Sequence, residues 1–189
     1  MKRTLMEQLI AWKSGGNRKP LILMGARQVG KTYILQSFAD KTYSNCCYVN
    51  FEDMPTMKAL FQTSLMPKDI ITALSIEFEM QIVPGRTLII FDEIQECPQA
   101  LNSLKYFCEN ANEYHLCAAG SLLGVKLMHT KGFPIGKVNF LHLYPLSFHE
   151  FLMANKQRQL ADFLLAIKSI KPLPRNLHEK LNKLFTFYL

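Results

Sequence analysis

The chain has 189 residues, of which 49% are hydrophobic and 20% are charged, and its formal net charge is +7 at pH 7. This composition is typical of a folded globular protein with one domain of ordinary size, and it excludes a disordered chain. No apolar run approaches the roughly 18 residues of a membrane span, so we expect no contact with a membrane. Residues 1–122 are balanced in charge, and residues 123–189 carry the whole excess of Lys and Arg.

The N-terminal segment begins with basic residues, as a signal peptide does, but it does not continue as one. Glu7 and Lys13 interrupt the apolar stretch, and no small-residue cleavage site follows. Leu5, Leu9 and Trp12 recur near helical spacing, which predicts an amphipathic helix. The five cysteines form no C-x-x-C pair, so we expect free thiols in a cytoplasmic protein rather than disulfides or a zinc site.

Short apolar runs alternate with helix-like stretches through the first 146 residues. Continuous apolar strands separated by helices predict a parallel sheet that is covered on both faces. We expect strands at Leu21–Met24, Cys47–Phe51, Thr87–Phe91, His115–Ala119 and Val138–Leu143. We expect helices at Lys31–Ala39, at Met54–Gln81 with a break near Pro67, and at Pro98–Asn112.

The character of the sequence changes after Pro145. Ser147 and Glu150 have the spacing of a capping box, which opens a helix. The rest is basic and helical in pattern, with an apolar stripe formed by Leu177, Leu181, Leu184 and Tyr188. No stop signal ends the stripe, so we expect the chain to be cut from a larger protein. We therefore expect an α/β domain at 1–146 and a basic helical segment at 147–189, the start of a lid or C-terminal region.

The segment from Gly25 to Thr32, G-A-R-Q-V-G-K-T, fits the phosphate-binding pattern G-x-x-x-x-G-K-[ST] at every fixed position. The glycines permit a tight turn at which backbone N–H groups converge on phosphate oxygens, and the following helix points its positive end at the same place. Lys31 is expected to reach the β- and γ-phosphates, and the Thr32 hydroxyl to ligate Mg²⁺. The alternative is a simple glycine turn between a strand and a helix. The residues expected to contact the nucleotide are Gly25, Ala26, Arg27, Gln28, Val29, Gly30, Lys31, Thr32 and Tyr33.

A second motif is the apolar strand that ends in two carboxylates, Asp92 and Glu93, about sixty residues after Lys31. Asp92 is expected to hold Mg²⁺ through its water shell, and Glu93 to orient and polarise an attacking water. The adjacent Glu favours water over a metabolite hydroxyl as the acceptor. The spacing leaves room for the strand Cys47–Phe51 between the motifs, which suits the ATPase branch of P-loop folds, where the two motif strands are not neighbours.

A third element is Ser121, which follows Gly120 at the end of the fourth expected strand. A polar residue at a strand tip beside the phosphate loop can sense the γ-phosphate or the attacking water. Ser121 is equally well placed to be the N-cap of a following helix, and the two roles are compatible.

The order of these motifs resembles a family of AAA-type ATP-binding proteins of bacteria and archaea that carry a C-terminal domain of unknown function. The segments that carry the resemblance are G-A-R-Q-V-G-K-T, L-I-I-F-D-E-I-Q, A-A-G-S and G-K-V-N-F-L-H-L-Y-P-L-S-F-H-E-F-L. The resemblance implies a three-layer P-loop NTPase fold of the AAA/ASCE type, with a central, mostly parallel five-stranded sheet and a helical tail. It also implies ATP and Mg²⁺ as ligands, with Lys31, Glu93 and Ser121 in catalysis.

The chain departs from the family at Lys137, where members usually have Arg after glycine. Such an Arg is a plausible finger for the γ-phosphate of a neighbouring subunit, and Lys137 keeps the charge but lacks the planar bidentate fork. The alternative is a solvent-exposed lysine before a strand. Family members also continue into their C-terminal domain, which would be missing here.

Three functions remain open at this stage. The first is an Mg²⁺-dependent ATPase that turns over slowly in this chain. The second is an ATP-binding regulatory module without significant turnover, whose helical tail is read by a protein partner. The third is an ATPase that acts on nucleic acid, for which the basic last third is the evidence. Self-association is common among AAA-type domains and is expected without a specific sequence signal.

Overall fold

The computed structural model describes residues 3–121, 136–169 and 172–189. The chain divides into two compact units, Leu5–Tyr144 and a smaller one that combines Met1–Thr4 with Pro145–Leu189. The boundary between Tyr144 and Pro145 lies at the point where the sequence changes character. No sequence pattern indicated that the N-terminal residues belong to the smaller unit. Among the described residues, no helix has the length and apolar character needed to cross a membrane.

Five parallel strands form one sheet in the order β2-β3-β4-β1-β5. All five expected strands are present, and no end differs from its expected position by more than two residues. Strand β4 separates β1 from β3, so the two motif strands are not neighbours, as the ATPase branch requires. The strand that lies between the motifs in the sequence, β2, is at the edge of the sheet instead. The strands are β1 (Leu21–Met24), β2 (Asn45–Asn50), β3 (Thr87–Asp92), β4 (His115–Gly120) and β5 (Asn139–His142).

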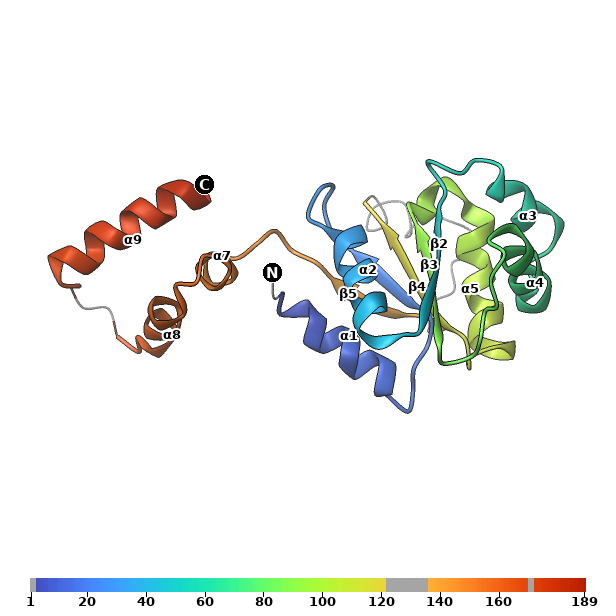
Figure 1. Ribbon diagram of the computed structural model, residues 1–189, viewed down its shortest axis with the longest axis horizontal. Coiled ribbons are helices and arrows are strands. Elements are labelled where there is room, and N and C mark those ends of the chain that lie inside the picture. Colours follow the sequence, from blue (N-terminus) through green and yellow to red (C-terminus); the bar gives the residue numbers. More distant parts are fainter. Residues whose placement is uncertain (1–2, 122–135, 170–171) are drawn as a thin grey trace. The chain divides into compact units, whose positions relative to one another are not determined.

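Helices cover both faces of the sheet, α1 and α2 on one face and α3, α4 and α5 on the other (Figure 1). Neighbouring strand residues face opposite layers, so Leu21 and Leu23 pack towards α1 and α2 while Ile22 packs towards α5. The fold is therefore the three-layer α/β arrangement expected from the sequence. The helices are α1 (Leu5–Ser14), α2 (Lys31–Thr42), α3 (Met57–Thr63), α4 (Pro67–Glu77), the 3₁₀ helix η1 (Ile94–Glu96) and α5 (Pro98–Asn110).

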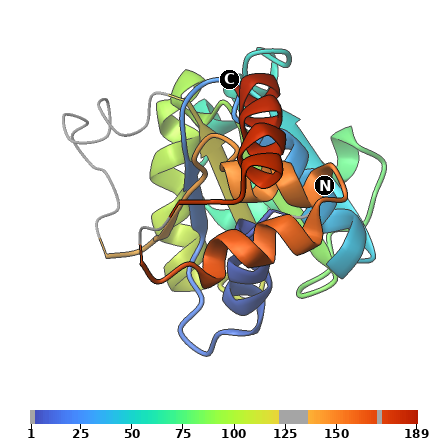
Figure 2. The ribbon, with the colours of Figure 1, turned by 90° about the vertical axis from the view of Figure 1, so that its left-hand side faces the viewer.

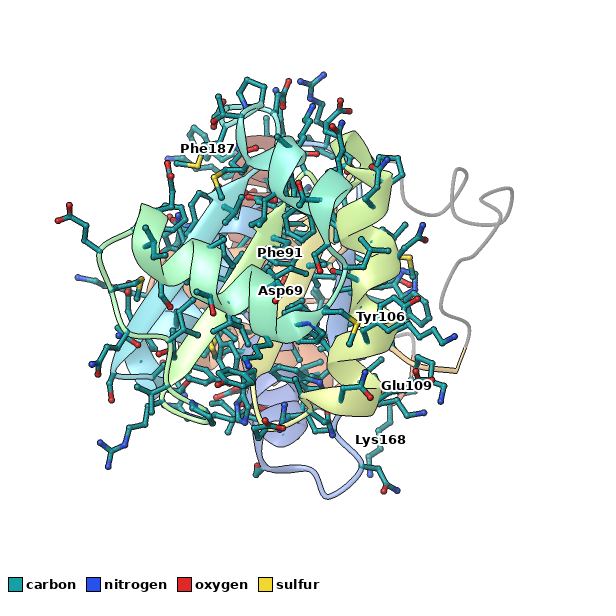
Figure 3. The ribbon with its side chains drawn as sticks, turned by 90° about the vertical axis from the view of Figure 1, so that its right-hand side faces the viewer. Asp69, Phe91, Tyr106, Glu109, Lys168 and Phe187 are labelled. Carbon is teal, nitrogen blue, oxygen red and sulfur yellow. The ribbon has the colours of Figure 1, made fainter. Side chains whose placement is uncertain are left out.

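The helical region expected at 54–81 is two short helices, α3 and α4. The break comes at residues 64–66, and Pro67 occupies the first turn of α4, where its missing N–H costs nothing. The region ends early because Glu79 adopts a left-handed conformation, with φ of 48°. In Figure 3 these two helices lie in front of the sheet, and Glu109 is labelled near the end of α5.

An aromatic cluster anchors β3 beneath α3. The rings of Phe51, Phe61 and Phe91 are fully buried and meet edge to face, with centroids 5.4 to 5.6 Å apart. Such pairs contribute about 0.5–1.5 kcal/mol each beyond the burial of their area. Phe91, labelled in Figure 3, directly precedes Asp92, so the cluster fixes the end of the strand that carries the acidic motif.

The smaller unit contains α7 (Phe148–Ala154), α8 (Arg158–Ala166) and α9 (Arg175–Tyr188), and the axes of α8 and α9 are far from parallel (Figure 2). The expected capping box is present, with Ser147 and Glu150 each bonded to the other's backbone N–H. The small core of the unit consists of Leu152, Leu160, Ala161 and Leu181. Of the expected stripe on α9, Leu181 is buried, and Leu177 and Leu184 pack against it.

Glu150 ties the N-terminus to α7 inside this unit. Its Oε1 accepts hydrogen bonds from the Thr4 backbone N–H (3.0 Å) and hydroxyl (3.3 Å) and lies 3.2 Å from Arg3 Nε. Burial raises the pKa of Glu150, but the N–H groups of Ser147 and Thr4 and the charge of Arg3 outweigh it and hold that pKa below its ordinary value. The carboxylate is therefore ionised and fully partnered, which stabilises the unit at neutral pH.

Candidate nucleotide-binding site

The loop between β1 and α2 turns sharply at two residues. Gly30, the N-cap of α2, has φ of 92°, a conformation that favours glycine. Gln28 is also left-handed, with φ of 64°, which is uncommon for a residue with a side chain. Arg27 and Gln28 at the tip are exposed, whereas Lys31 at the start of α2 is buried. The loop thus leads directly from a buried strand into the N-terminus of a helix.

Gly25 is required by a close backbone approach from Leu143, the residue that follows β5. A Cβ atom at this position would lie 2.3 Å from the Leu143 carbonyl oxygen and 3.2 Å from Val29 Cγ2. Leu143 is itself held by a hydrogen bond of 2.7 Å from its N–H to the Met24 carbonyl. The end of β5 therefore closes against the start of the loop, and a side chain at residue 25 does not fit.

The Lys31 ammonium curls back over the loop. Only 6% of Lys31 is exposed, and its Nζ donates to the carbonyl oxygens of Gly25 (3.0 Å) and Ala26 (2.8 Å). Burial lowers the pKa of Lys31, and the negative charges of Glu93 and Asp92 act in the opposite direction. Two neutral carbonyl acceptors thus hold the Lys31 ammonium beside the loop. Hydrogen bonds to anionic oxygens are stronger than hydrogen bonds to such carbonyls.

Asp92 joins the loop to the end of β3. Its Oδ2 accepts hydrogen bonds from the Thr32 hydroxyl (2.6 Å) and the Tyr48 hydroxyl (3.0 Å), and its Oδ1 accepts from the Glu93 N–H (3.0 Å). Asp92 is 1% exposed. Burial, followed by the charge of Asp92, raises the pKa of Tyr48. Two of the expected site residues, Thr32 and Asp92, are therefore in direct contact.

The Thr32 and Asp92 oxygens fit the chemistry of a magnesium site. Mg²⁺ prefers hard oxygen ligands and is usually bound by one or two protein groups together with substrate phosphates and water. Among the described residues, no cluster of three or more His, Cys, Asp or Glu side chains makes an all-protein metal site. The Thr32 hydroxyl and the Asp92 carboxylate are hard oxygen ligands of this kind, and they lie side by side.

Glu93, the residue after Asp92, has a strained backbone conformation, and its side chain is hydrogen-bonded to Gln95. Its φ is 46°, in the left-handed region, and it is the N-cap of η1. Its Oε2 accepts a hydrogen bond from Gln95 Nε2. The other amide atom, Gln95 Oε1, is buried without a partner among the described residues. Gln95 was not among the site residues expected from the sequence, although it lies two residues after Glu93 in the same motif.

Ser121 lies at the carboxyl ends of the strands, and Lys137 lies at their amino ends. Gly120 pairs in register with Met24, so Ser121 follows at the level of Gly25, beside the loop, and it is partly buried. The helix that Ser121 was expected to cap would begin in residues 122–135, outside the described residues. Lys137 precedes β5 at the amino edge, where its Nζ lies 2.9 Å from Glu109 Oε1. It is ion-paired rather than free in solvent, and it cannot reach the phosphate loop of its own chain.

A model of the AAA domain family matches residues 17–152, more than half of the chain and the whole of the loop, sheet and acidic pair. The chain belongs to the AAA domain family. This places it among ATPase-type nucleotide-binding domains, which agrees with the fold and the geometry of the loop. No curated protein matches the chain.

The solved structures similar to this AAA domain have low sequence identity to it. Drosophila ORC bound to DNA is 18% identical, with a TM-score of 0.52 over 85% of this chain and 48% of the other. DnaA from Aquifex aeolicus bound to AMPPCP is 14% identical, with a TM-score of 0.49 over 96% and 59%. ORC1 from Aeropyrum pernix in complex with DNA is 15% identical, with a TM-score of 0.49 over 82% and 47%. The chain spans about half the length of these proteins.

Proposed function

We propose that this AAA domain binds Mg·ATP at Gly25–Thr32 and hydrolyses it to ADP and phosphate. The observation that carries the proposal is the 2.6 Å hydrogen bond between Thr32 and Asp92, which brings the phosphate loop and the acidic strand end to one place. The buried Lys31 beside the loop supplies the positive charge. Membership of the AAA domain family supports the same reaction class.

Binding of the phosphates uses groups that the fold already aligns. The loop N–H groups and the N-terminus of α2 would receive the phosphate oxygens, and Lys31 would exchange the Gly25 and Ala26 carbonyls for the β- and γ-phosphates. Thr32 and Asp92 would hold Mg²⁺, which neutralises the charge that develops on the phosphates. Arg27, Gln28, Val29 and Tyr33 would complete the nucleotide contacts around the loop.

Hydrolysis requires a water molecule in line with the γ-phosphorus. In the proposed step a bond forms between the water oxygen and the γ-phosphorus, and the bond to the β–γ bridging oxygen breaks, leaving ADP. Glu93 would orient the water and accept its proton, and the Gln95 amide would hold the Glu93 carboxylate in place. Ser121, level with Gly25, would donate a hydrogen bond to the γ-phosphate.

Any role for Lys137 would be played in a second copy of the protein. Its place at the amino edge of the sheet directs it away from its own phosphate loop, and its ion pair with Glu109 must open before it contacts a neighbour's γ-phosphate. We therefore expect slow turnover by the isolated chain and faster turnover on self-association.

Phosphate release and nucleotide affinity measured on the same sample test the proposal. Glu93→Gln should keep the affinity and lose phosphate release by about 100-fold or more, the range of general base catalysis. Glu96→Gln changes an exposed carboxylate three residues away and should leave both unchanged. Equal rates for Glu93→Gln and the unmodified protein would remove Glu93 from the mechanism. Tight binding with no phosphate above the Lys31→Ala background would favour a regulatory ATP-binding module instead.

Nucleic acid is a second candidate ligand, favoured by one feature of the smaller unit. A hollow of about 480 Å³ is lined by Lys156, Gln157, Arg158, Gln159, Leu160, Phe163, Leu177 and Lys180. Three cations around an exposed aromatic ring suit a phosphodiester chain with a stacked base. Drosophila ORC, which shares the fold, is bound to DNA in its structure.

Oligonucleotide binding at increasing salt separates this candidate from a solvated basic surface. Lys156→Glu with Lys180→Glu should weaken binding and flatten the dependence of affinity on salt, because each lost phosphate contact lowers the slope by about 0.7 for a single strand. Lys183→Glu, outside the hollow, is the control for net charge. No binding at low salt would eliminate this candidate and leave the ATPase proposal unchanged.

A further inference from the structure

Asp92 has a hydrogen-bond donor that belongs to neither nucleotide motif. The Tyr48 hydroxyl lies 3.0 Å from Asp92 Oδ2, the same oxygen that accepts from Thr32. Tyr48 is on β2, opposite Ile90 of β3, and residues two apart on a strand share a face. Its side chain therefore reaches diagonally across the shared face to Asp92. A long aromatic side chain can span the distance between such diagonal neighbours.

The environment of Asp92 makes each of its donors important. A carboxylate that is 1% exposed is separated from water, so protein hydrogen bonds fix its orientation. The Glu93 N–H fixes Oδ1, and Thr32 and Tyr48 fix Oδ2. Thr32 belongs to the loop that must accommodate phosphates, so Tyr48 is the Oδ2 donor that stays on the sheet while the loop responds to a ligand.

We propose that Tyr48 is a positioning residue of the magnesium site, which holds Asp92 in the orientation that supports Mg²⁺ bound together with ATP. The inference rests on the proposed function and extends it to a residue outside the phosphate loop and the acidic pair. Tyr48 acts through Asp92 and does not contact the nucleotide. Its effect is therefore on the Mg²⁺ dependence of nucleotide binding rather than on binding without the metal.

The test is the Mg²⁺ dependence of binding to a fluorescent ATP analogue by Tyr48→Phe, which removes one oxygen and keeps the ring. The Mg²⁺ concentration that gives half of the affinity gain should rise about tenfold, the effect of one hydrogen bond to a charged group. Affinity in the presence of EDTA should not change. A double variant with Asp92→Asn should show no further shift beyond Asp92→Asn alone, because Tyr48 acts through that carboxylate.

The matched control is Tyr43→Phe. Its hydroxyl lies 2.7 Å from His115 Nδ1, so it also loses one partly buried hydrogen bond, at a different place in the same unit. Thermal unfolding of both variants reports any structural effect, and only Tyr48→Phe should shift the Mg²⁺ curve.

The outcomes separate the two proposals. If the unmodified protein binds the analogue in an Mg²⁺-dependent way and Tyr48→Phe shifts the curve no more than Tyr43→Phe, the role of Tyr48 is overturned and the proposed function stands. A Tyr48→Phe protein that fails to fold also overturns it, since the hydroxyl would then be structural. If the unmodified protein binds no analogue with or without Mg²⁺, the proposed function itself fails.

Discussion

Replacing Gly25 with alanine would place a methyl group 2.3 Å from the carbonyl oxygen of Leu143. The two atoms must separate by about 1 Å to reach ordinary contact. Neither side yields easily, because Leu143 is hydrogen-bonded to Met24 and the neighbouring His142 is in register with Met24 on β1. We therefore expect the phosphate loop to move away from β5.

The expected cost follows from that displacement. Forcing an extra carbon into a packed site costs about 1–3 kcal/mol. If the native state absorbs the strain, the free energy of unfolding falls by about this amount. If the loop is displaced instead, nucleotide affinity falls by about 5- to 150-fold, the same free energy expressed as a binding constant. The sum of the two losses should be about 1–3 kcal/mol.

Gly16 provides the control for Gly25→Ala, and Gly30 provides a comparison in which backbone strain acts without a steric clash. A Cβ at Gly16 meets nothing within 4 Å and the residue has no positive φ, so Gly16→Ala should change neither quantity. A Cβ at Gly30 also meets nothing, but φ of 92° makes alanine strained there by about 1–3 kcal/mol. Urea denaturation and calorimetry with an ATP analogue measure both terms. If Gly25→Ala matched Gly16→Ala in stability and affinity, the close approach of β5 to the loop would be refuted.

Three further predictions concern other buried groups. Glu150→Ala should destabilise the smaller unit by about 1–3 kcal/mol, measured by hydrogen exchange, because the Thr4 and Ser147 N–H groups lose their acceptor. Glu179→Ala, in an exposed ion pair, should cost at most about 0.5 kcal/mol. Burial lowers the pKa of His115 to about 4, so its contribution to stability is present above pH 6.5 and is lost as the pH falls towards 4. Between pH 6.5 and 4, this effect lowers the free energy of unfolding, measured by urea denaturation, by up to about 3 kcal/mol. His115→Gln should make that free energy depend less on pH in this range. An unchanged pH dependence would contradict a buried neutral imidazole. Gln95→Ala should slow phosphate release about tenfold with unchanged affinity, and a faster rate would mean that Gln95 restrains Glu93 rather than positions it.

Local patterns explain why much of the fold and the core of the site were predictable from the sequence. The central strands β3 and β4 are buried on both faces, so apolar runs such as 88–91 stand out without ambiguity. The phosphate loop needs glycine for steric reasons at Gly25 and for its conformation at Gly30. The carboxyl ends of parallel strands meet at one edge, which brings Thr32 and Asp92 together.

The features that the sequence analysis missed depend on tertiary arrangement. Tyr48 reaches Asp92 only because β2 lies beside β3, an order that no local pattern specifies. The bond from Thr4 to Glu150 joins residues that are 146 positions apart. Helix periodicity likewise placed the end of the helical region at Gln81 rather than Glu77, because a left-handed turn such as that at Glu79 has no periodic signature.

The central claim is that the loop from Gly25 to Thr32 is an anion cradle that shares a cation with Asp92. Calorimetry with a nonhydrolysable ATP analogue, with and without Mg²⁺, tests it most directly. The account predicts one nucleotide bound per chain, with affinity that rises with Mg²⁺ and falls by at least about 100-fold in Lys31→Ala, the loss expected for charge-assisted bonds to phosphate. Absence of binding under all conditions, or equal affinity in Lys31→Ala, would contradict the account.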